Sequence, residues 1–315
     1  MTAPIGLVLF AVAINCVGSR WLRAAHWVDR APALGIAVWQ VLMASVLMAL
    51  GLAGLAVALP LSPGTARLSS LLEACSSVLK DHYTTPGGIG FSVFGAVVTI
   101  VALSRILYCS GVEIRTIKRG RGYQRRCLSL SAFRDEEWDF LVLDHSTPAV
   151  YCVPGLPSGV VVTSGARAKL SDEQLRAVVA HEHAHLDEHH DVVLASVGAL
   201  YRALPHLACV KFGHLEMTRL VEMRADDIAL RASDRITLAR ALVNLAQGDT
   251  PAGALGAGGA ALARLHRLMK PRRPISWGAR LLAGSAAVAL LVIPMMLVAE
   301  PAAVVAMMHY CPIDI

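Results

Sequence analysis

The stretch LRAVVAHEHAHL, Leu175–Leu186, contains the pattern His-Glu-x-x-His at residues 181–185. On an α-helix, residues i and i+4 lie on one face, one turn apart. His181 and His185 can therefore direct two imidazole nitrogens at one metal ion, with Glu182 beside them. Two neutral nitrogen ligands, an open coordination position and an adjacent carboxylate base are what a hydrolytic zinc centre requires. The stretch predicts zinc bound by His181 and His185, with Glu182 as the catalytic base.

The residues before the motif predict where its helix begins. The run Ser171–Gln174 (SDEQ) has the form of a capping box, so we expect a helix from Asp172 to about His190. The lead-in to the motif is apolar, and ionisable groups in such a helix are costly unless something pairs with them. A metal ion would do so. The charged segment 187–191 is expected to be a solvated helix end.

The composition is that of a membrane protein. The 315 residues are 55% hydrophobic and only 17% charged, and the mean hydropathy of +0.55 is too high for an ordinary soluble domain. Basic residues beside membrane spans explain the net charge of +6, so we expect no direct binding of nucleic acid. The seven Cys form no Cys-x-x-Cys pair, which argues against a thiolate zinc site or a redox motif.

Four apolar stretches are expected to be transmembrane helices. They are Pro4–Gly18, Ala33–Leu59, Ile89–Cys109 and the segment Trp277–Ala299. The fold class that follows is a mainly α polytopic membrane protein whose helical zincin domain carries a small β-sheet. We place three spans in residues 1–110, the metallopeptidase domain in 111–276, and the final span with a short outer tail in 277–315.

Lys and Arg are distributed unevenly around these spans. Three Arg follow the first span, at positions 20, 23 and 30, and six basic residues follow the third span between positions 115 and 126. The tail after the last span contains Glu300 and Asp314 but no Lys or Arg. Because basic loops stay on the cytoplasmic side, we predict a multi-pass protein of the cell membrane with both termini outside and a cytoplasmic catalytic domain.

The predicted outer loop, 61–88, and the outer tail each contain one Cys. Cys75 and Cys311 would both face the oxidising side of the membrane. A disulfide between them and two unrelated thiols are both open interpretations.

Two short strands are expected ahead of the motif helix. Ala149–Val153 and Gly159–Thr163 are rich in β-formers and flank a Pro-Gly turn. A strand in this place could pair with the extended backbone of a substrate beside the metal. An ordinary strand of the sheet is an equally good interpretation.

Zinc held by two His needs a third protein ligand, and the predicted helix Glu216–Leu230 offers one. Glu222 and Asp226 lie at i and i+4 and can both face the motif helix. We expect Glu222 to bind the metal and Asp226 to accept a hydrogen bond from a ligand His, which fixes its tautomer. The alternative is a solvated face on which Glu222 pairs with Arg219 or Arg224.

Two further segments complete the predicted domain. Val192–Phe212 is apolar enough to be a fifth span, but a crossing would place Glu222 across the bilayer from His181. We therefore expect it to be a re-entrant or interfacial helical element that turns back at the membrane. Ala261–Met269 has the pattern of a short amphipathic helix before the last span.

These features together resemble the integral-membrane zinc metallopeptidases related to the BlaR/MecR antirepressor sensors, gluzincins with a downstream Glu-x-x-Ala-Asp. The matching parts are VVTSG (161–165), LSDEQLRAVVAHEHAH (170–185), the Pro-containing apolar helix and EMRADD (222–227). The resemblance covers about residues 90–300 and implies zinc bound by His181, His185 and Glu222, with Glu182 as base. It also implies a cytoplasmic protease whose activation leads to cleavage of a small DNA-binding repressor.

The expected function is therefore a membrane-embedded zinc endopeptidase acting on a protein substrate, such as a winged-helix repressor of the BlaI/MecI type. The chain ends soon after its last span and has no counterpart of the penicillin-binding sensor domain, so β-lactam sensing is not expected. An HtpX-like quality-control protease is one alternative, and the CAAX-processing proteases are related membrane zinc proteases. A non-catalytic zinc-binding sensor or scaffold is another, although an intact Glu182 argues against it.

Overall fold

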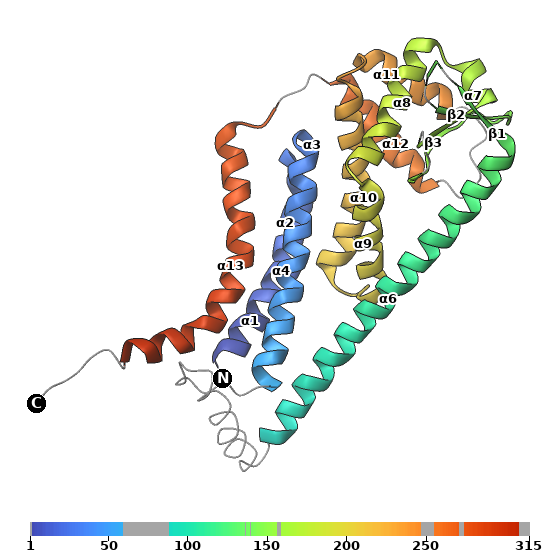
Figure 1. Cartoon of the computed structure of the whole chain (residues 1–315). Helices are drawn as coiled ribbons and strands as arrows, with labels where there is room; N and C mark the ends of the chain where they lie inside the picture. Colours follow the sequence, from blue (N-terminus) through green and yellow to red (C-terminus); the bar gives the residue numbers. More distant parts are fainter. Residues whose placement is uncertain are drawn as a thin grey trace, which may run out of the picture.

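The chain folds into a bundle of long helices that carries a small α/β domain at one end (Figure 1). The computed structural model describes residues 2–58, 88–135, 137–138, 140–155, 159–246, 255–270 and 274–308. The predicted outer loop, apart from its last residue, lies outside the described residues, as do Cys75 and Cys311. The expected fold class is confirmed: the described chain is mainly helical, with four candidate membrane spans and one four-stranded sheet.

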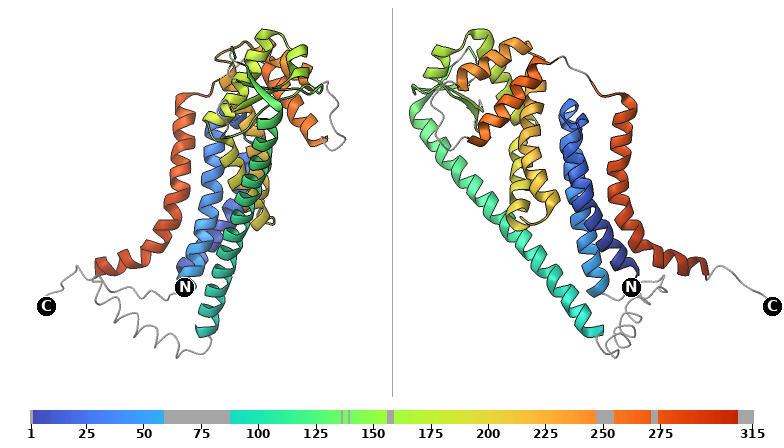
Figure 2. Two further views of the ribbon diagram at one scale, coloured as in Figure 1. Left: turned by 45° about the vertical axis from the view of Figure 1, so that its right-hand side comes forward. Right: turned by 180° about the vertical axis from the view of Figure 1, so that it is seen from behind.

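The four candidate spans are Ala3–Ala24, Pro32–Ala58, Gly90–Ser131 and Trp277–Ala299. The first consists of α1 (Thr2–Ala13), a π-helical turn η1 (Ile14–Gly18) and α2 (Ser19–Ala24); the others belong to α4 (Pro32–Ala58), α6 (Gly88–Ser131) and α13 (Trp277–Met308). A short helix, α3 (Trp27–Arg30), lies in the connection between the first two spans. The start of α1 and the far end of α13 lie at the opposite end of the bundle from the α/β domain (Figures 1 and 2).

The third span does not end where its apolar run ends. Helix α6 continues for 22 residues beyond Cys109, to Ser131, through the whole Arg-rich segment. That segment contains no Pro, and Arg and Lys are good helix formers when their charges face solvent. The expected boundary near residue 110 therefore falls inside one continuous helix, which leads directly into the sheet (Figure 1).

The apolar segment after the motif helix forms a helical hairpin. Helix α9 (His190–Ala203) ends at a turn, and α10 (Ala208–Ala229) runs back alongside it. At the turn, the side-chain oxygen of Asn15 accepts a hydrogen bond of 3.0 Å from the backbone N–H of Cys209. This satisfies one of the donors that the first turn of α10 leaves without an intrahelical partner. Because Asn15 belongs to the first span, the hairpin reaches into the level of the spans and returns.

Close packing holds α10 against α4. A Cβ at Gly213 would lie 2.7 Å from Sδ of Met43, so a larger side chain at this position would require the Met43 side chain to move. Trp39, Met217 and Leu220 are fully buried in the same apolar core. The returning helix is thus fixed to the second span along its first three turns.

The sheet has the order β1-β2-β4-β3, and β3 is an edge strand. Its strands are β1 (Ala132–Asp135), β2 (Phe140–Leu143), β3 (Val150–Cys152) and β4 (Val160–Thr163). β4 pairs in parallel with β2 and antiparallel with β3, and all four of its residues are buried. The two strands expected from the sequence correspond to β3 and β4, each shorter than predicted; β1 and β2 were not predicted.

Helix α8 (Asp172–Asp187) carries the His-Glu-x-x-His motif. The predicted capping box is present, since Ser171 accepts from the backbone of Gln174 and the Gln174 side chain accepts from the backbone of Ser171. Leu175 and Val178 pack on the sheet, and α8 also contacts α10 and α11 (Arg235–Ala246). Helix α12 (Leu255–Met269) covers α10 and α11 and is longer than the predicted Ala261–Met269.

Candidate metal centre

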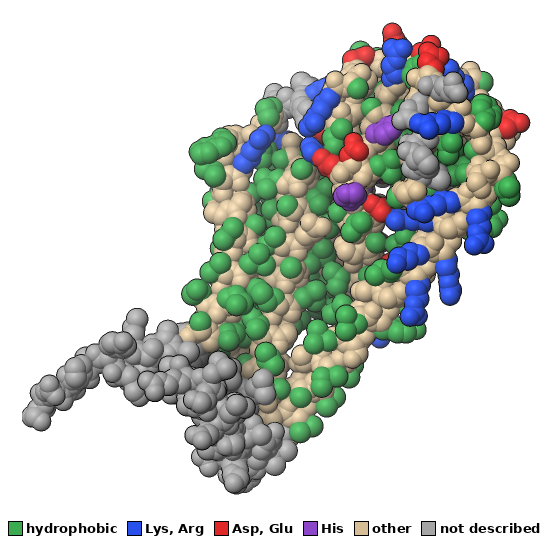
Figure 3. All heavy atoms as spheres, in the orientation of Figure 1, with side chains coloured by type: hydrophobic (Ala, Val, Ile, Leu, Met, Phe, Trp, Pro, Cys, Tyr) green, Lys and Arg blue, Asp and Glu red, His purple; other side chains and the backbone are tan. Residues whose placement is uncertain are grey.

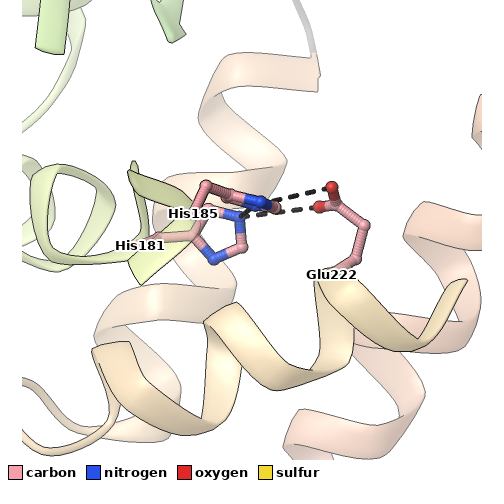
Figure 4. Close-up of side chains that lie close together, drawn as sticks. All are labelled: His181, His185 and Glu222. Carbon is pink, nitrogen blue, oxygen red and sulfur yellow. Dashed lines mark hydrogen bonds and ion pairs between the residues drawn. The ribbon is translucent and has the colours of Figure 1, made fainter. Parts of the chain in front are cut away.

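The three predicted ligands come together between α8 and α10 (Figure 4). Nε2 of His181 and Nε2 of His185 lie 3.2 Å apart, and each lies 3.5 Å from a carboxylate oxygen of Glu222. The three ligand atoms are all within 4.8 Å of one another. Two imidazole nitrogens and one carboxylate form the protein donor set of a catalytic zinc site, so the residues present fit the metal.

Small side chains allow the two helices to approach closely enough for this. Ala177 and Ala184 on α8, and Ala225 and Ala229 on α10, are fully buried. Any larger side chain at these positions would separate the helices and move Glu222 away from the two imidazoles.

Asp226 lies one turn beyond Glu222 and is fully buried. Its Oδ1 lies 3.2 Å from Nδ1 of His181, although without the alignment of a full hydrogen bond. This is the ring nitrogen that a metal on Nε2 would leave free. The position of Asp226 is therefore the one expected for a residue that fixes the tautomer of a ligand His.

The charge states of these groups favour a cation between the two imidazoles. Burial alone would lower the pKa of His181, but Asp226 and Glu222 raise it to about 9. Burial lowers the pKa of His185 to about 4. Burial would raise the pKa of Glu222, but His181 and Arg264 beside it lower the value to about 2. At neutral pH the two facing nitrogens thus hold one positive charge next to a carboxylate, and a divalent ion would replace that proton.

Glu182 points to the sheet side of the ligands. Burial raises the pKa of its carboxyl group. Burial of the neighbouring Cys152 thiol on β3, together with the negative charge of Glu182 and a hydrogen bond to it, raises the pKa of Cys152 to about 12. A carboxylate in a partly dry site is a stronger proton acceptor than one in water, which suits a general base.

His190 was expected at a solvated helix end, and that expectation is wrong: the residue is 2% exposed. Its Nδ1 lies 3.0 Å from Nδ1 of His185, and its Nε2 lies 3.5 Å from the carboxylate of Glu188. His189 makes this possible because its left-handed backbone, with φ of 51°, turns the chain back at the end of α8. His190 therefore lies beside Nδ1 of His185, as Asp226 lies beside Nδ1 of His181.

Arg264 of α12 is a second part of the site that the sequence did not predict. It donates through Nε and Nη2 to the two oxygens of Asp226, at 2.9 and 2.6 Å, and through Nη1 to Glu222 at 2.7 Å. Its Nη2 also lies 3.4 Å from Nε2 of His181. The only local signal was an Arg in a predicted amphipathic helix, which does not indicate where that helix packs.

The alternative of a solvated face around Glu222 does not describe the structure. Arg219 pairs with Glu216 and with Asp29, and Arg224 pairs with Glu188. Neither Arg is a partner of Glu222, which faces the two imidazoles instead.

A cavity of about 520 Å³ opens beside the ligands. Its walls come from seven helices and strands, and they include His181, Glu182, His185 and Glu222 together with Cys152 of β3, Leu194 of α9 and Leu242 of α11. The free edge of β3 borders this space, because β3 pairs on its other side with β4. The arrangement can hold an extended chain between an apolar wall and a buried carboxylate.

Residues 122–211 match the model of Peptidase family M48. The matched segment contains His181, Glu182 and His185 but ends before Glu222. Peptidases of this family depend on zinc, so the match and the ligand set together support a zinc metallopeptidase. No curated protein and no solved structure matches the chain.

Proposed function

We propose that this chain is a membrane-embedded zinc endopeptidase whose active site faces the cytoplasm. The observation that carries the proposal is the meeting of His181, His185 and Glu222 beside a buried Glu182, in a cavity that borders an edge strand. A closed structural zinc site has four protein ligands and no need of a base. The three-ligand set with a neighbouring carboxylate favours hydrolysis.

Zinc held by these ligands would polarise the scissile carbonyl and acidify a water molecule. Glu182 would take the proton from the attacking water and pass it to the leaving amine. Asp226 and His190 would keep the two ligand imidazoles in the correct tautomer. The free edge of β3 would bind the substrate backbone as an added antiparallel strand, which orients the peptide bond across the site.

The test is Glu182→Gln in the full-length protein in detergent or nanodiscs. We expect proteolysis of a casein substrate to fall by at least a hundredfold while zinc content, measured by elemental mass spectrometry, stays at the wild-type level. His183→Gln is the matched control, because His183 bonds to the carbonyl of Val179 within its own helix. Undiminished cleavage by Glu182→Gln would contradict the proposal. A zinc-loaded wild type without proteolytic activity would favour the non-catalytic scaffold.

For the substrate, we propose a cytoplasmic regulatory protein such as a winged-helix repressor; the support is the resemblance of VVTSG, the motif helix and EMRADD to the antirepressor sensors. Proteomics of cells with wild type or Glu182→Gln would test it. One stabilised repressor is the expected result. Broad accumulation of damaged membrane proteins would instead favour the HtpX-like quality-control role.

The proposed orientation can be tested with Cys127, which is exposed on α6 near the sheet. A variant that keeps only this Cys should resist a membrane-impermeant thiol reagent in intact cells and react after permeabilisation. Labelling in intact cells would place the domain outside.

A further inference from the structure

A second cavity, of about 560 Å³, lies behind the metal centre, between the connection of the first two spans, α10 and α12. Five basic side chains line it, against two carboxylates: Arg30, Arg219, Arg235, Arg267 and Lys270, against Asp29 and Asp227. His26 and His266 add two imidazoles. The lining is therefore strongly cationic.

Part of this charge is already neutralised within the protein. Nη1 of Arg219 lies 2.6 Å from Asp29, and Nη2 of Arg267 lies 2.9 Å from both oxygens of Asp227. The remaining cations have no such partner: among the described residues, no carboxylate pairs with Arg30 or Lys270, and both side chains are exposed. Arg235 donates to the backbone carbonyl of Lys270. The cavity thus presents hydrogen-bond donors and uncompensated positive charge, which attract an anion.

The cavity lies where the spans end. Arg30 lies between the spans Ala3–Ala24 and Pro32–Ala58, and Lys270 precedes the span Trp277–Ala299 by seven positions. Trp277 is 74% exposed at the start of that span, as expected for an interfacial anchor. Figure 3 shows basic, acidic and His side chains gathered between the upper end of α13 and the domain, above a mainly hydrophobic belt. This is the level of the phospholipid headgroups.

We propose that this cavity binds the phosphate headgroup of an anionic phospholipid from the adjoining leaflet. The phosphate would be held by Arg30 and Lys270 at the mouth, with Arg235 beside them. Basic pockets at the ends of transmembrane helices suit such headgroups because the charges attract the phosphate while the acyl chains stay in the bilayer. A lipid source is favoured over a free phosphate because the span Trp277–Ala299, which follows Lys270, exposes apolar side chains such as Leu281 and Leu282 that would contact the acyl chains.

The cavity and the metal centre have two helices in common, α10 and α12. On α10, Glu222 and Asp226 face the two histidines of the metal centre. The residues that follow each of them, Met223 and Asp227, line the basic cavity. On α12, Arg264 contacts Glu222 and Asp226. Three positions later, Arg267 bonds to the carbonyl of Asp29 and to Asp227. A bound headgroup would therefore stabilise the same two helices that position the third metal ligand.

The test is native mass spectrometry of the full-length protein, released from micelles with defined lipids. We expect retention of phosphatidylglycerol over phosphatidylcholine, and at least a tenfold loss of that retention in Arg30→Gln/Lys270→Gln. Lys169→Gln/Arg240→Gln removes the same charge from exposed positions outside the cavity and should retain phosphatidylglycerol normally. Arg30→Lys/Lys270→Arg should also retain it, because the charges remain.

Three results would overturn the proposal. One is equal retention of the two lipids by the wild type. Another is wild-type retention of phosphatidylglycerol by Arg30→Gln/Lys270→Gln. The third is displacement of the lipid by millimolar glycerol phosphate, which would assign the cavity to a soluble phosphate. None of these measurements uses proteolysis, so the result does not depend on the proposed enzyme activity.

Discussion

Nη1 of Arg264 lies 2.7 Å from Oε2 of Glu222, while the same carboxylate lies 3.5 Å from the imidazoles of His181 and His185. Glu222, the predicted third metal ligand, is thus contacted from two sides, by the motif helix and by α12, which begins 33 residues after it. This contact explains how α12, which provides no metal ligand, becomes part of the metal centre. A single substitution at Arg264 would therefore remove contacts to both Glu222 and Asp226.

Arg264→Met should strongly destabilise the protein. It would leave the carboxylate of Asp226, which is fully buried, without its arginine partner, and breaking a buried pair in this way costs about 3 kcal/mol or more. Adding Asp226→Asn should recover part of the loss, because the unpaired charge is then gone. Thermal unfolding in detergent measures both, with Arg240→Met as the exposed control. If the double variant is no more stable than Arg264→Met, the unpaired charge is not the cause.

His190→Ala should weaken zinc binding without removing a ligand. Its Nδ1 lies 3.0 Å from Nδ1 of His185, and loss of such an orienting partner typically lowers metal affinity by about 10- to 100-fold. Competition with a fluorescent chelator measures the affinity. His183→Ala removes a nearby imidazole that bonds only to its own helix and should leave zinc affinity unchanged. Equal affinities in the two variants would show that His190 does not orient His185.

Asn15→Leu should loosen the hairpin of α9 and α10. The Asn15 side chain satisfies a backbone donor at the start of α10, within the level of the spans, and polar contacts of this kind contribute about 0.6 kcal/mol on average. The free energy of unfolding in mixed detergent and SDS should fall accordingly. Ser45→Ala is the control, since buried Ser45 bonds only to a carbonyl of its own helix. A larger loss for Ser45→Ala than for Asn15→Leu would contradict the capping role.

The ion pair of Glu188 and Arg224 predicts a pH dependence of stability. The hydrogen bond from Arg224 lowers the pKa of Glu188 in the folded protein. Its contribution is therefore present above the unfolded pKa of about 4.3 and is lost as the pH falls through the folded value. Because both side chains are partly exposed, the effect should be below about 1 kcal/mol.

Glu188→Gln should accordingly be less stable than the wild type at pH 7, with the difference shrinking below about pH 4. Thermal unfolding midpoints in one detergent across this range provide the measurement. Glu137→Gln, at an exposed position without a described ion pair, should behave like the wild type throughout. A difference for Glu188→Gln that grows towards low pH would reverse the predicted sign.

Local patterns were enough to predict features whose residues lie close together within one helix. The i, i+4 spacing of His181 and His185, the cap at Ser171 and the apolar runs of the spans each involve residues close in the chain. Glu222 could be predicted as well, because a zinc site needs a third ligand and few helices offer one. For these features the physical requirement is visible in the order of the residues.

Contacts between distant parts of the chain decided the rest. Arg264 reaches Asp226 across 38 positions, and Asn15 reaches Cys209 across 194. The buried position of His190 depends on a left-handed turn at His189, a residue for which such a backbone is uncommon. The basic cavity, likewise, requires the connection of the first two spans to meet α12. Local patterns cannot predict such meetings, because they are set by how whole helices pack and not by the spacing of residues along any one of them.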